Sequence, residues 1–211
     1  FNNLYAVWTD DRDGEPDIYF AQLPAGTGVW SSNVRVNYVR TGRQDYPDVA
    51  VDGEGAVHVV WEDYRQGQHD PDIYWATLPA GAPNWSPGLR INDDLGAAPQ
   101  RRPAIAVTRK GSVYAVWEDG RNDDGAPPPN GDIYFALLRY DTTRWSGNLR
   151  VNTDQGQAHQ EQPAIATDWD GNGYVVWRDF RSSTTAPDIF FAFLFNPERI
   201  RLYLPMLVKE D

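Results

Sequence analysis

Acidic and basic side chains recur in this chain at one fixed spacing, within the pattern Val-Trp-x-Asp-x-Arg. A carboxylate and a guanidinium two residues apart could bind a charged substrate, or they could pair within the protein. Because a ligand site is normally asymmetric and this pattern is repeated, we interpret the pairs as scaffolding. In the expected hairpin, each Arg could reach the Asp that begins the next strand, at 17, 72, 132 or 188. The scaffolding pairs are Asp10 with Arg12, Asp63 with Arg65, Asp119 with Arg121, and Asp179 with Arg181.

Residues that break the repeat are better candidates for ligand contact, because exposed loops on a rigid scaffold usually carry binding. The loop after the third copy of the pattern is the longest, and it contains three consecutive prolines. The polar loops between units each end in Gln-x-x-Pro, and a few aromatic residues could stack on a sugar, Trp169 among them. The predicted ligand-face residues are Gln44, Tyr46, Tyr64, Gln100, Asn122, Asp123, Asp124 and Gln160.

Histidines and clustered acidic residues are the side chains in this sequence that could bind a metal ion. The three histidines lie in different units without ligand spacing, which argues against zinc. The segment DWDGNG (168–173) begins like a calcium loop, but the twelfth position, where an EF-hand has a bidentate Glu, is Asp179 at the end of a predicted strand, so a hairpin turn is favoured. We therefore expect no cofactor, and calcium is the one ion that the sequence would allow. The candidate calcium ligands are Asp93, Asp94, Asp168 and Asp170.

Composition narrows the classes of partner. The 211 residues carry a formal net charge of −11, which argues against nucleic acid and against anionic membrane surfaces. Aromatic residues make up 13% and hydrophobic residues 41%, enough for a sizeable core. The chain lacks cysteine, and the apolar run at 202–208 is too short to span a bilayer. The first residue is Phe1, so we expect a processed or partial chain, located outside the cell or on its surface.

The pattern defines a long internal repeat. Its tryptophans, Trp8, Trp61, Trp117 and Trp177, are 53, 56 and 60 residues apart, a period typical of propeller blades. The third unit contains four short β-rich segments, at 103–108, 113–119, 132–138 and 145–152, bounded by Gly, Pro, Asn or Asp. Helical periodicity is almost absent. The sequence therefore predicts an all-β chain, a β-propeller of four-stranded antiparallel blades, with the large aromatic residues between blades.

The repeat resembles the Asp-box (BNR) repeats of sialidase-like β-propellers over about 190 residues. The resemblance is carried by the order P-x-I-A-V, V-W-x-D-x-R, D-I-Y-F-A, then a turn and a Trp. Trp30, Trp85 and Trp145 match the Trp of the box, but the box Ser is absent from all three turns and the box Asp is displaced. The resemblance implies ligand binding on the face where the second-to-third and fourth-to-first strand connections meet.

The four units are predicted as one domain, at about 1–46, 47–102, 103–162 and 163–198, followed by a closing strand at 199–208. The first unit lacks its first strand, and the tail alternates apolar and other residues as a strand does. Three arrangements stay open: a closed four-bladed ring, part of a larger ring, or a tail that completes a neighbouring subunit.

The sequence favours a non-catalytic extracellular propeller that acts as a binding or surface-structural module, with carbohydrate or a protein as the partner. The alternatives are a fragment of a sialidase-like glycoside hydrolase and a polymer subunit joined by exchange of the C-terminal strand. A sialidase-type site needs an Arg cluster, an acid and a Tyr nucleophile, and all candidates here lie at repeated positions. Glu62 and Glu118 follow the repeated Trp where the other units have Thr9 and Arg178, which is a weak signal for catalysis.

Overall fold

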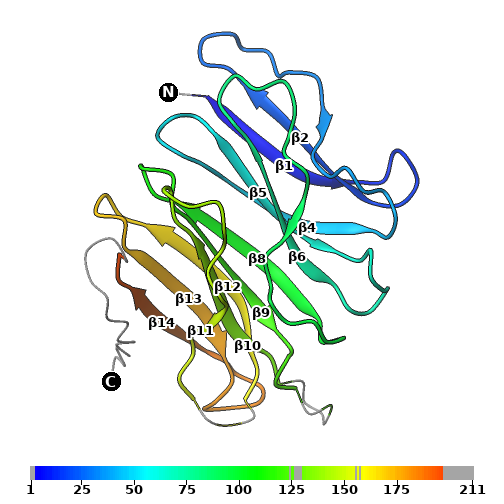
Figure 1. Ribbon diagram of the computed structural model, residues 1–211. Coiled ribbons are helices and arrows are strands. Elements are labelled where there is room, and N and C mark those ends of the chain that lie inside the picture. Colours follow the sequence, from blue (N-terminus) through cyan, green and yellow to red (C-terminus); the bar gives the residue numbers. More distant parts are fainter. Residues whose placement is uncertain (1–2, 124, 126–129, 155, 157, 197–211) are drawn as a thin grey trace.

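The computed structural model describes residues 3–123, 125, 130–154, 156 and 158–196, and these form four antiparallel sheets (Figure 1). The prediction of an all-β chain built from such units is confirmed. The first sheet contains β1 (Leu4–Asp10), β2 (Asp17–Leu23) and β3 (Val34–Arg35). The second contains β4 (Gln44–Val51), β5 (Val57–Asp63), β6 (Asp72–Leu78) and β7 (Leu89–Arg90). The third contains β8 (Gln100–Val107), β9 (Val113–Asp119), β10 (Asp132–Leu138) and β11 (Leu149–Arg150), and the fourth contains β12 (Gln160–Thr167), β13 (Gly173–Asp179) and β14 (Asp188–Leu194).

Each sheet is one repeat unit, and a tight turn joins the first two strands of the second, third and fourth sheets. In the second unit, Asp52 accepts hydrogen bonds from the backbone N–H of Glu54 (2.9 Å) and Ala56 (2.9 Å), and Gly55 adopts a φ of 91°. A positive φ is easy for glycine, which explains its place in this turn. We call the face with these turns the bottom face. The opposite face, where β5 and β9 end and β8 and β12 begin, is called the top face.

The repeated tryptophans fill the spaces between sheets, as predicted. Trp61 and Trp117 have no solvent exposure and Trp177 has 2%. Trp61 packs with Ile18 and Phe20 of the preceding sheet, and the other two face the sheet before them in the same way. Each hydrophobic cluster therefore holds two consecutive sheets together.

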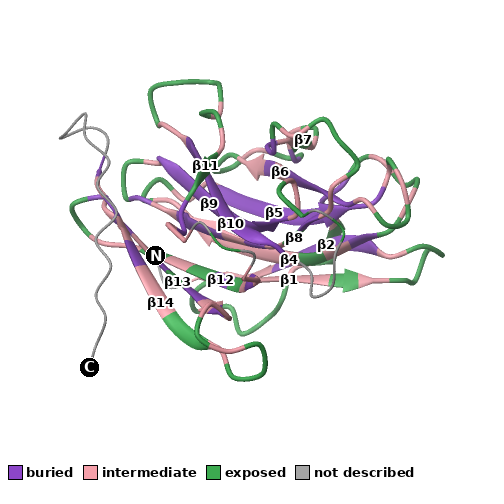
Figure 2. Cartoon of the chain, turned by 90° about the horizontal axis from the view of Figure 1, so that it is seen from below, coloured by how far each residue is buried: buried purple, intermediate pink, exposed green. Residues whose placement is uncertain are grey.

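In the described part of the chain, the first and fourth sheets each have one packing face that no neighbouring sheet covers. Ile18, Ile73 and Ile133 occupy equivalent positions in β2, β6 and β10 and are all fully buried, whereas Ile189 in β14 is 72% exposed. Figure 1 shows the first and fourth sheets at opposite ends of a row, and Figure 2 shows less burial in β1 and β14 than in β5 and β9. The described residues thus form an open arc rather than a closed ring. The predicted closing strand, 199–208, lies outside the described residues.

A β-bulge opens the first strand of the second, third and fourth sheets near the top face. The register shifts between Asp45 and Asp48 in β4, and at the matching places in β8 and β12. One residue in each bulge is non-glycine with a positive φ: Tyr46 (50°), Arg102 (49°) and Gln162 (54°). Such residues are uncommon, and each precedes a proline. Bulges re-aim side chains and backbone groups, and here they bring each strand start against the preceding sheet.

Candidate functional site

Charged side chains from three sheets meet on the top face, where the ends of β5, β9 and β13 approach the bulges of β8 and β12. The spacing of the repeat puts one residue after each Trp at a strand end, and the bulge turns the next sheet's backbone toward it. We call this group the top-face cluster. Its members are Glu62, Tyr64, Arg101, Arg102, Glu118, His159, Glu161 and Arg178.

Glu62 joins the second sheet to the third. Its Oε1 accepts a hydrogen bond from the backbone N–H of Arg102 at 2.8 Å, and its Oε2 accepts one from the Tyr64 hydroxyl at 2.7 Å. Burial raises the pKa of Glu62. Burial and the bond to Glu62 raise the pKa of Tyr64 to about 12, although the Arg43 guanidinium lies 4.0 Å from the centre of its ring. The phenol therefore keeps its proton at neutral pH and is a weak nucleophile.

Glu118 repeats this arrangement one sheet later. Its Oε1 accepts the backbone N–H of Gln162 at 2.6 Å and lies 3.3 Å from Nη1 of Arg102. Burial raises the pKa of Glu118 to about 7, against the opposing effect of these two partners, and the charges of Glu161 and Glu62 raise it further. This carboxyl group is therefore partly protonated near neutral pH, a state that a general acid requires.

Glu161 contacts three basic side chains of the cluster. Its Oε1 lies 2.6 Å from Nη1 of Arg178, and its Oε2 lies 3.5 Å from Nη1 of Arg102 and 3.5 Å from Nε2 of His159. The other imidazole nitrogen, Nδ1, accepts the backbone N–H of Gly131 at 3.0 Å. Burial lowers the pKa of His159, which favours the neutral ring.

A small cavity of about 70 Å³ lies beside this group. Its walls include Arg101, Glu118, Asp123 and His159. That volume is far below a typical ligand pocket, so the cavity can receive one edge of a ligand and not a whole ring. Carboxylates and guanidinium groups in the walls offer acceptors and donors to hydroxyl groups.

The repeated Asp–Arg pairs hold the strand ends, but each Arg pairs with the Asp of its own strand end and not with the Asp across the hairpin. Across the hairpin, each guanidinium group lies over an aromatic ring instead. Asp119 is fully buried and accepts hydrogen bonds from Nε1 of Trp117 at 2.9 Å and from Nε of Arg121 at 2.9 Å. The Asp at the start of the third strand instead meets an Arg of the fourth strand, as in Arg35 with Asp17 at 3.2 Å. The prediction that the repeated Arg pairs with the Asp at the start of the third strand is therefore wrong, because an Arg of the fourth strand pairs with that Asp instead. The remaining pairs follow the same pattern: Asp10 with Arg12, Asp63 with Arg65, and Asp179 with Arg181.

The three glutamines predicted on the ligand face are buried. Gln44, Gln100 and Gln160 have 0%, 1% and 0% exposure. Oε1 of Gln44 accepts a hydrogen bond from Nδ2 of Asn37 at 2.8 Å, and the same amide donates to Asp17 at 2.6 Å. Their placement at the surface is corrected, since each side chain ties the loop between two sheets to the preceding sheet.

The other predicted ligand-face residues differ in exposure. Tyr46 is 58% exposed on the top face, whereas the Tyr64 side chain is buried in the cluster. Asn122 is exposed but donates to Asp132 at 2.6 Å, and Asp123 lines the small cavity. Asp124 lies outside the described residues.

The candidate calcium ligands make contacts within the protein. Asp168 accepts the backbone N–H of Asn172 at 2.9 Å and the hydroxyl of Tyr174 at 2.8 Å, as expected of a hairpin turn. Among the described residues, no three acidic, His or Cys side chains come together as a metal site would require. Of the other three candidates, Asp93 pairs with Arg121, Asp94 accepts a hydrogen bond from the backbone N–H of Gly96, and Asp170 borders a bottom-face pocket.

Sequence reasoning did not find most of the top-face cluster. Arg102, His159 and Glu161 lie at different offsets from the repeated pattern, and only their spatial meeting gives them a shared environment. One signal was available: the residue before the proline of each Gln-x-x-Pro segment varies, and that residue has the positive φ.

Solved structures with similar folds include carbohydrate-active enzymes. An α-L-arabinanase from Penicillium chrysogenum, solved with arabinobiose, matches with a TM-score of 0.65 and 14% identity, over 98% of this chain and 63% of the arabinanase. A GH93 α-L-arabinofuranosidase from Fusarium graminearum matches with a TM-score of 0.65 and 12% identity, over 93% of this chain and 60% of the enzyme. A Hadza microbial sialidase matches with a TM-score of 0.54 and 14% identity, over 85% and 43%.

The chain has a sialidase-like β-propeller fold. At these identities the likeness shows the fold alone, and the chain spans less than two thirds of each of these proteins. No known family's sequence profile matches the chain, and no curated protein matches its sequence. The degenerate Asp boxes therefore stay a prediction. No helix in the described part of the chain is long and apolar enough to cross a membrane.

Proposed function

We propose that this chain is a non-catalytic carbohydrate-binding propeller that takes a hydroxyl-rich sugar on its top face. The observation that carries the proposal is the cavity walled by Arg101, Glu118 and His159. Planar guanidinium and carboxylate groups can each engage two neighbouring hydroxyls of a sugar, and the small cavity would receive one edge of the ring.

The bonding of the acidic residues supports binding rather than hydrolysis. Glu62 and Glu118 each hold a backbone N–H of the following sheet, so both carboxylates serve the scaffold. The Tyr64 hydroxyl has a pKa raised to about 12, which does not suit a nucleophile. Similarity to glycoside hydrolases supports a carbohydrate ligand only at the level of the fold.

A second candidate function, glycoside hydrolysis by a larger propeller, is favoured by one observation. The pKa of Glu118 is raised to about 7, which suits a general acid that protonates a leaving oxygen. In this case blades outside the described residues would complete the site with a second carboxyl group.

Binding and turnover measured on the same samples test the proposal. Arabinobiose and sialyllactose are titrated against the chain by calorimetry, and products are followed by chromatography. Arg101 is exposed, so Arg101→Gln leaves the fold intact and is expected to weaken binding at least fivefold. Arg144→Gln, an exposed arginine on the turn before β11, is the matched control and should leave the affinity unchanged.

Failure of both sugars to bind, or binding that Arg101→Gln leaves unaltered, would contradict the proposal. Products that disappear in Glu118→Gln would instead establish the second function.

A further inference from the structure

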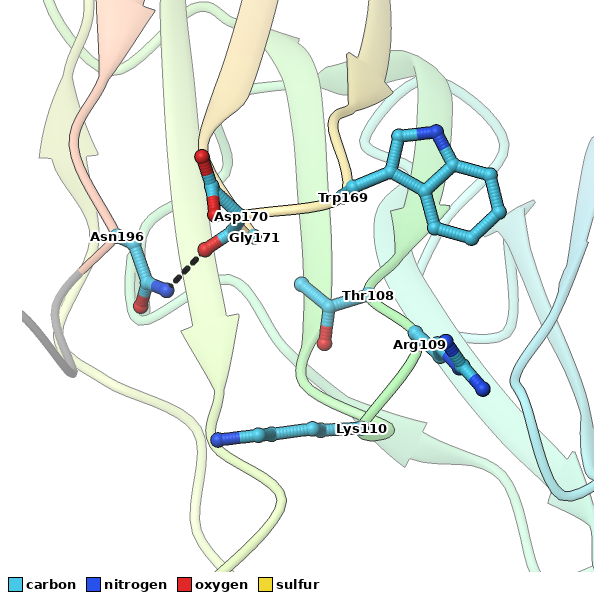
Figure 3. A pocket seen from close by; sticks show the side chains of 7 residues that line it. All are labelled: Thr108, Arg109, Lys110, Trp169, Asp170, Gly171 and Asn196. Carbon is cyan, nitrogen blue, oxygen red and sulfur yellow. Dashed lines mark hydrogen bonds between the residues drawn. The ribbon is translucent and has the colours of Figure 1, made fainter.

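A second pocket lies on the bottom face, between the β8–β9 turn and the β12–β13 turn (Figure 3). It has a volume of about 210 Å³, compared with about 70 Å³ for the cavity on the top face. β9 runs from this face to the top face, and seven strand residues span about 20 Å. The pocket is therefore separate from the top-face cluster. Its lining residues are Thr108, Arg109, Lys110, Trp169, Asp170, Gly171 and Asn196.

Trp169 distinguishes this pocket from a solvated turn. It is 88% exposed, so it contributes almost nothing to the core. The three bottom-face turns are equivalent, because each closes with a backbone hydrogen bond from its first residue to the carbonyl four residues later. Gly53 and Arg109 occupy the position of Trp169 in the other two turns. The indole is thus a feature of one turn and not of the repeat, and its open face offers the apolar surface on which a sugar ring stacks.

Arg109 supplies a cation beside the indole. Its side chain is exposed and makes no ion pair with any other described residue, in a chain whose formal net charge is −11. A guanidinium binds a planar carboxylate through two parallel hydrogen bonds. In Figure 3, Trp169 and Arg109 lie on one side of the pocket and Asn196 lies on the other. On that far side, Nδ2 of Asn196 donates to the backbone carbonyl of Asp170, and the side chains of both residues carry oxygen atoms that can accept hydrogen bonds from sugar hydroxyls.

Both turns are held firmly, which a preformed site requires. The hydroxyl of Tyr114 donates to the carbonyl of Gly171 at 3.0 Å, and the Asp168 carboxylate closes its own turn. On the other side, a Cβ added to Gly53 would come within 2.4 Å of the Arg109 carbonyl oxygen. The β4–β5 turn and the β8–β9 turn are therefore in direct contact, which fixes the Arg109 backbone.

We propose that this pocket binds an acidic sugar unit of a polysaccharide. The ring stacks on Trp169, the carboxylate of the sugar pairs with Arg109, and hydroxyls face Asp170 and Asn196. This site goes beyond the proposed function, because it is a separate pocket on the opposite face.

Trigalacturonate and its methyl ester form a matched pair of probes, since they differ in the charge of the carboxyl groups. Titrations of the full chain followed by NMR should show that the acid binds at least tenfold more tightly than the ester. Trp169→Ala should weaken binding of the acid at least tenfold, while Trp169→Phe keeps most of it. Arg109→Gln should abolish the preference for the acid over the ester. Both side chains are exposed, so these variants should fold, which circular dichroism verifies.

Three controls give each outcome a meaning. Trp30→Ala removes an exposed indole outside the pocket, and Arg101→Gln alters the top-face site; neither should change the affinity for trigalacturonate. Inorganic sulfate at the same concentration should not displace the sugar, which separates sugar recognition from simple anion binding.

The proposal is overturned if trigalacturonate does not bind, if the acid and ester bind equally, or if sulfate displaces the sugar. It is also overturned if binding depends on Arg101 and not on Trp169, which would assign the acid to the top face.

Discussion

Removal of one repeated arginine tests whether the Asp–Arg pairs are scaffolding. In Arg121→Ala, the fully buried Asp119 carboxylate loses hydrogen bonds from Nε at 2.9 Å and Nη2 at 2.8 Å. It keeps the bond from Nε1 of Trp117 and one from the backbone N–H of residue 121. The change also removes a guanidinium that lies 4.3 Å from the centre of the Tyr134 ring and contacts Asp93 at 2.8 Å.

Breaking a buried ion pair costs about 3–5 kcal/mol, and leaving one buried polar group short of partners costs about 1–3 kcal/mol. Asp119 keeps two donors and the Arg121 side chain is 20% exposed, so the lower range applies. We expect the free energy of unfolding to fall by about 2 kcal/mol, which corresponds to a melting temperature lower by about 4–8 °C. Urea denaturation followed by tryptophan fluorescence measures both the midpoint and the slope.

The first unit provides a matched control. Arg12 makes the same contacts with Asp10 and with the Tyr19 ring, but the Arg12 side chain is 45% exposed. Arg12→Ala should therefore lower stability far less than Arg121→Ala. Equal losses for the two variants, or a loss of ligand binding in Arg121→Ala without a loss of stability, would refute the scaffolding interpretation.

Three further predictions concern packing, protonation and the bottom-face turn. Ile133→Ala should lower the free energy of unfolding by about 2–5 kcal/mol because Ile133 is fully buried, whereas Ile189→Ala should change it little because Ile189 is 72% exposed. Denaturation of the two variants measures the difference, and equal losses would contradict the open arc. The folded chain keeps the Glu118 proton up to about pH 7, whereas the unfolded chain loses it near pH 4.5. The free energy of unfolding should therefore fall by about 3 kcal/mol as the pH rises from about 4.5 to about 7. In Glu118→Gln this pH-dependent contribution should be absent, which denaturation across the same pH range measures. Gly53→Ala should displace the Arg109 turn and weaken trigalacturonate binding without affecting arabinobiose, and unchanged affinity for trigalacturonate would show that the contact between turns is adjustable.

The repeat made the fold predictable. Four copies of one pattern with a tryptophan in each predicted the strands, and Trp61 and Trp117 are buried between sheets as their recurrence indicated. The tight Gly-rich turns and the antiparallel order follow from local residue preferences, which a single sequence displays directly.

The top-face cluster was not predictable in the same way, because it depends on contacts between units. The sequence showed that Glu62 and Glu118 break the repeat, but it did not show that each accepts a backbone N–H from the next sheet's bulge. That contact requires a positive φ at Arg102 and Gln162, which neither residue type favours. Gln160, predicted as a surface residue because its loop is polar, is buried since its amide links two sheets.

The central claim, a sugar-binding top face that does not cleave its ligand, is tested most directly by one NMR experiment on the full chain with arabinobiose. Line broadening of the sugar signals reports binding, and new anomeric signals over a day report cleavage in the same tube. The account predicts broadening that Arg101→Gln reduces, with an unchanged set of anomeric signals. It is contradicted by sugar signals that stay sharp at millimolar protein, or by new anomeric signals that are lost in Glu118→Gln.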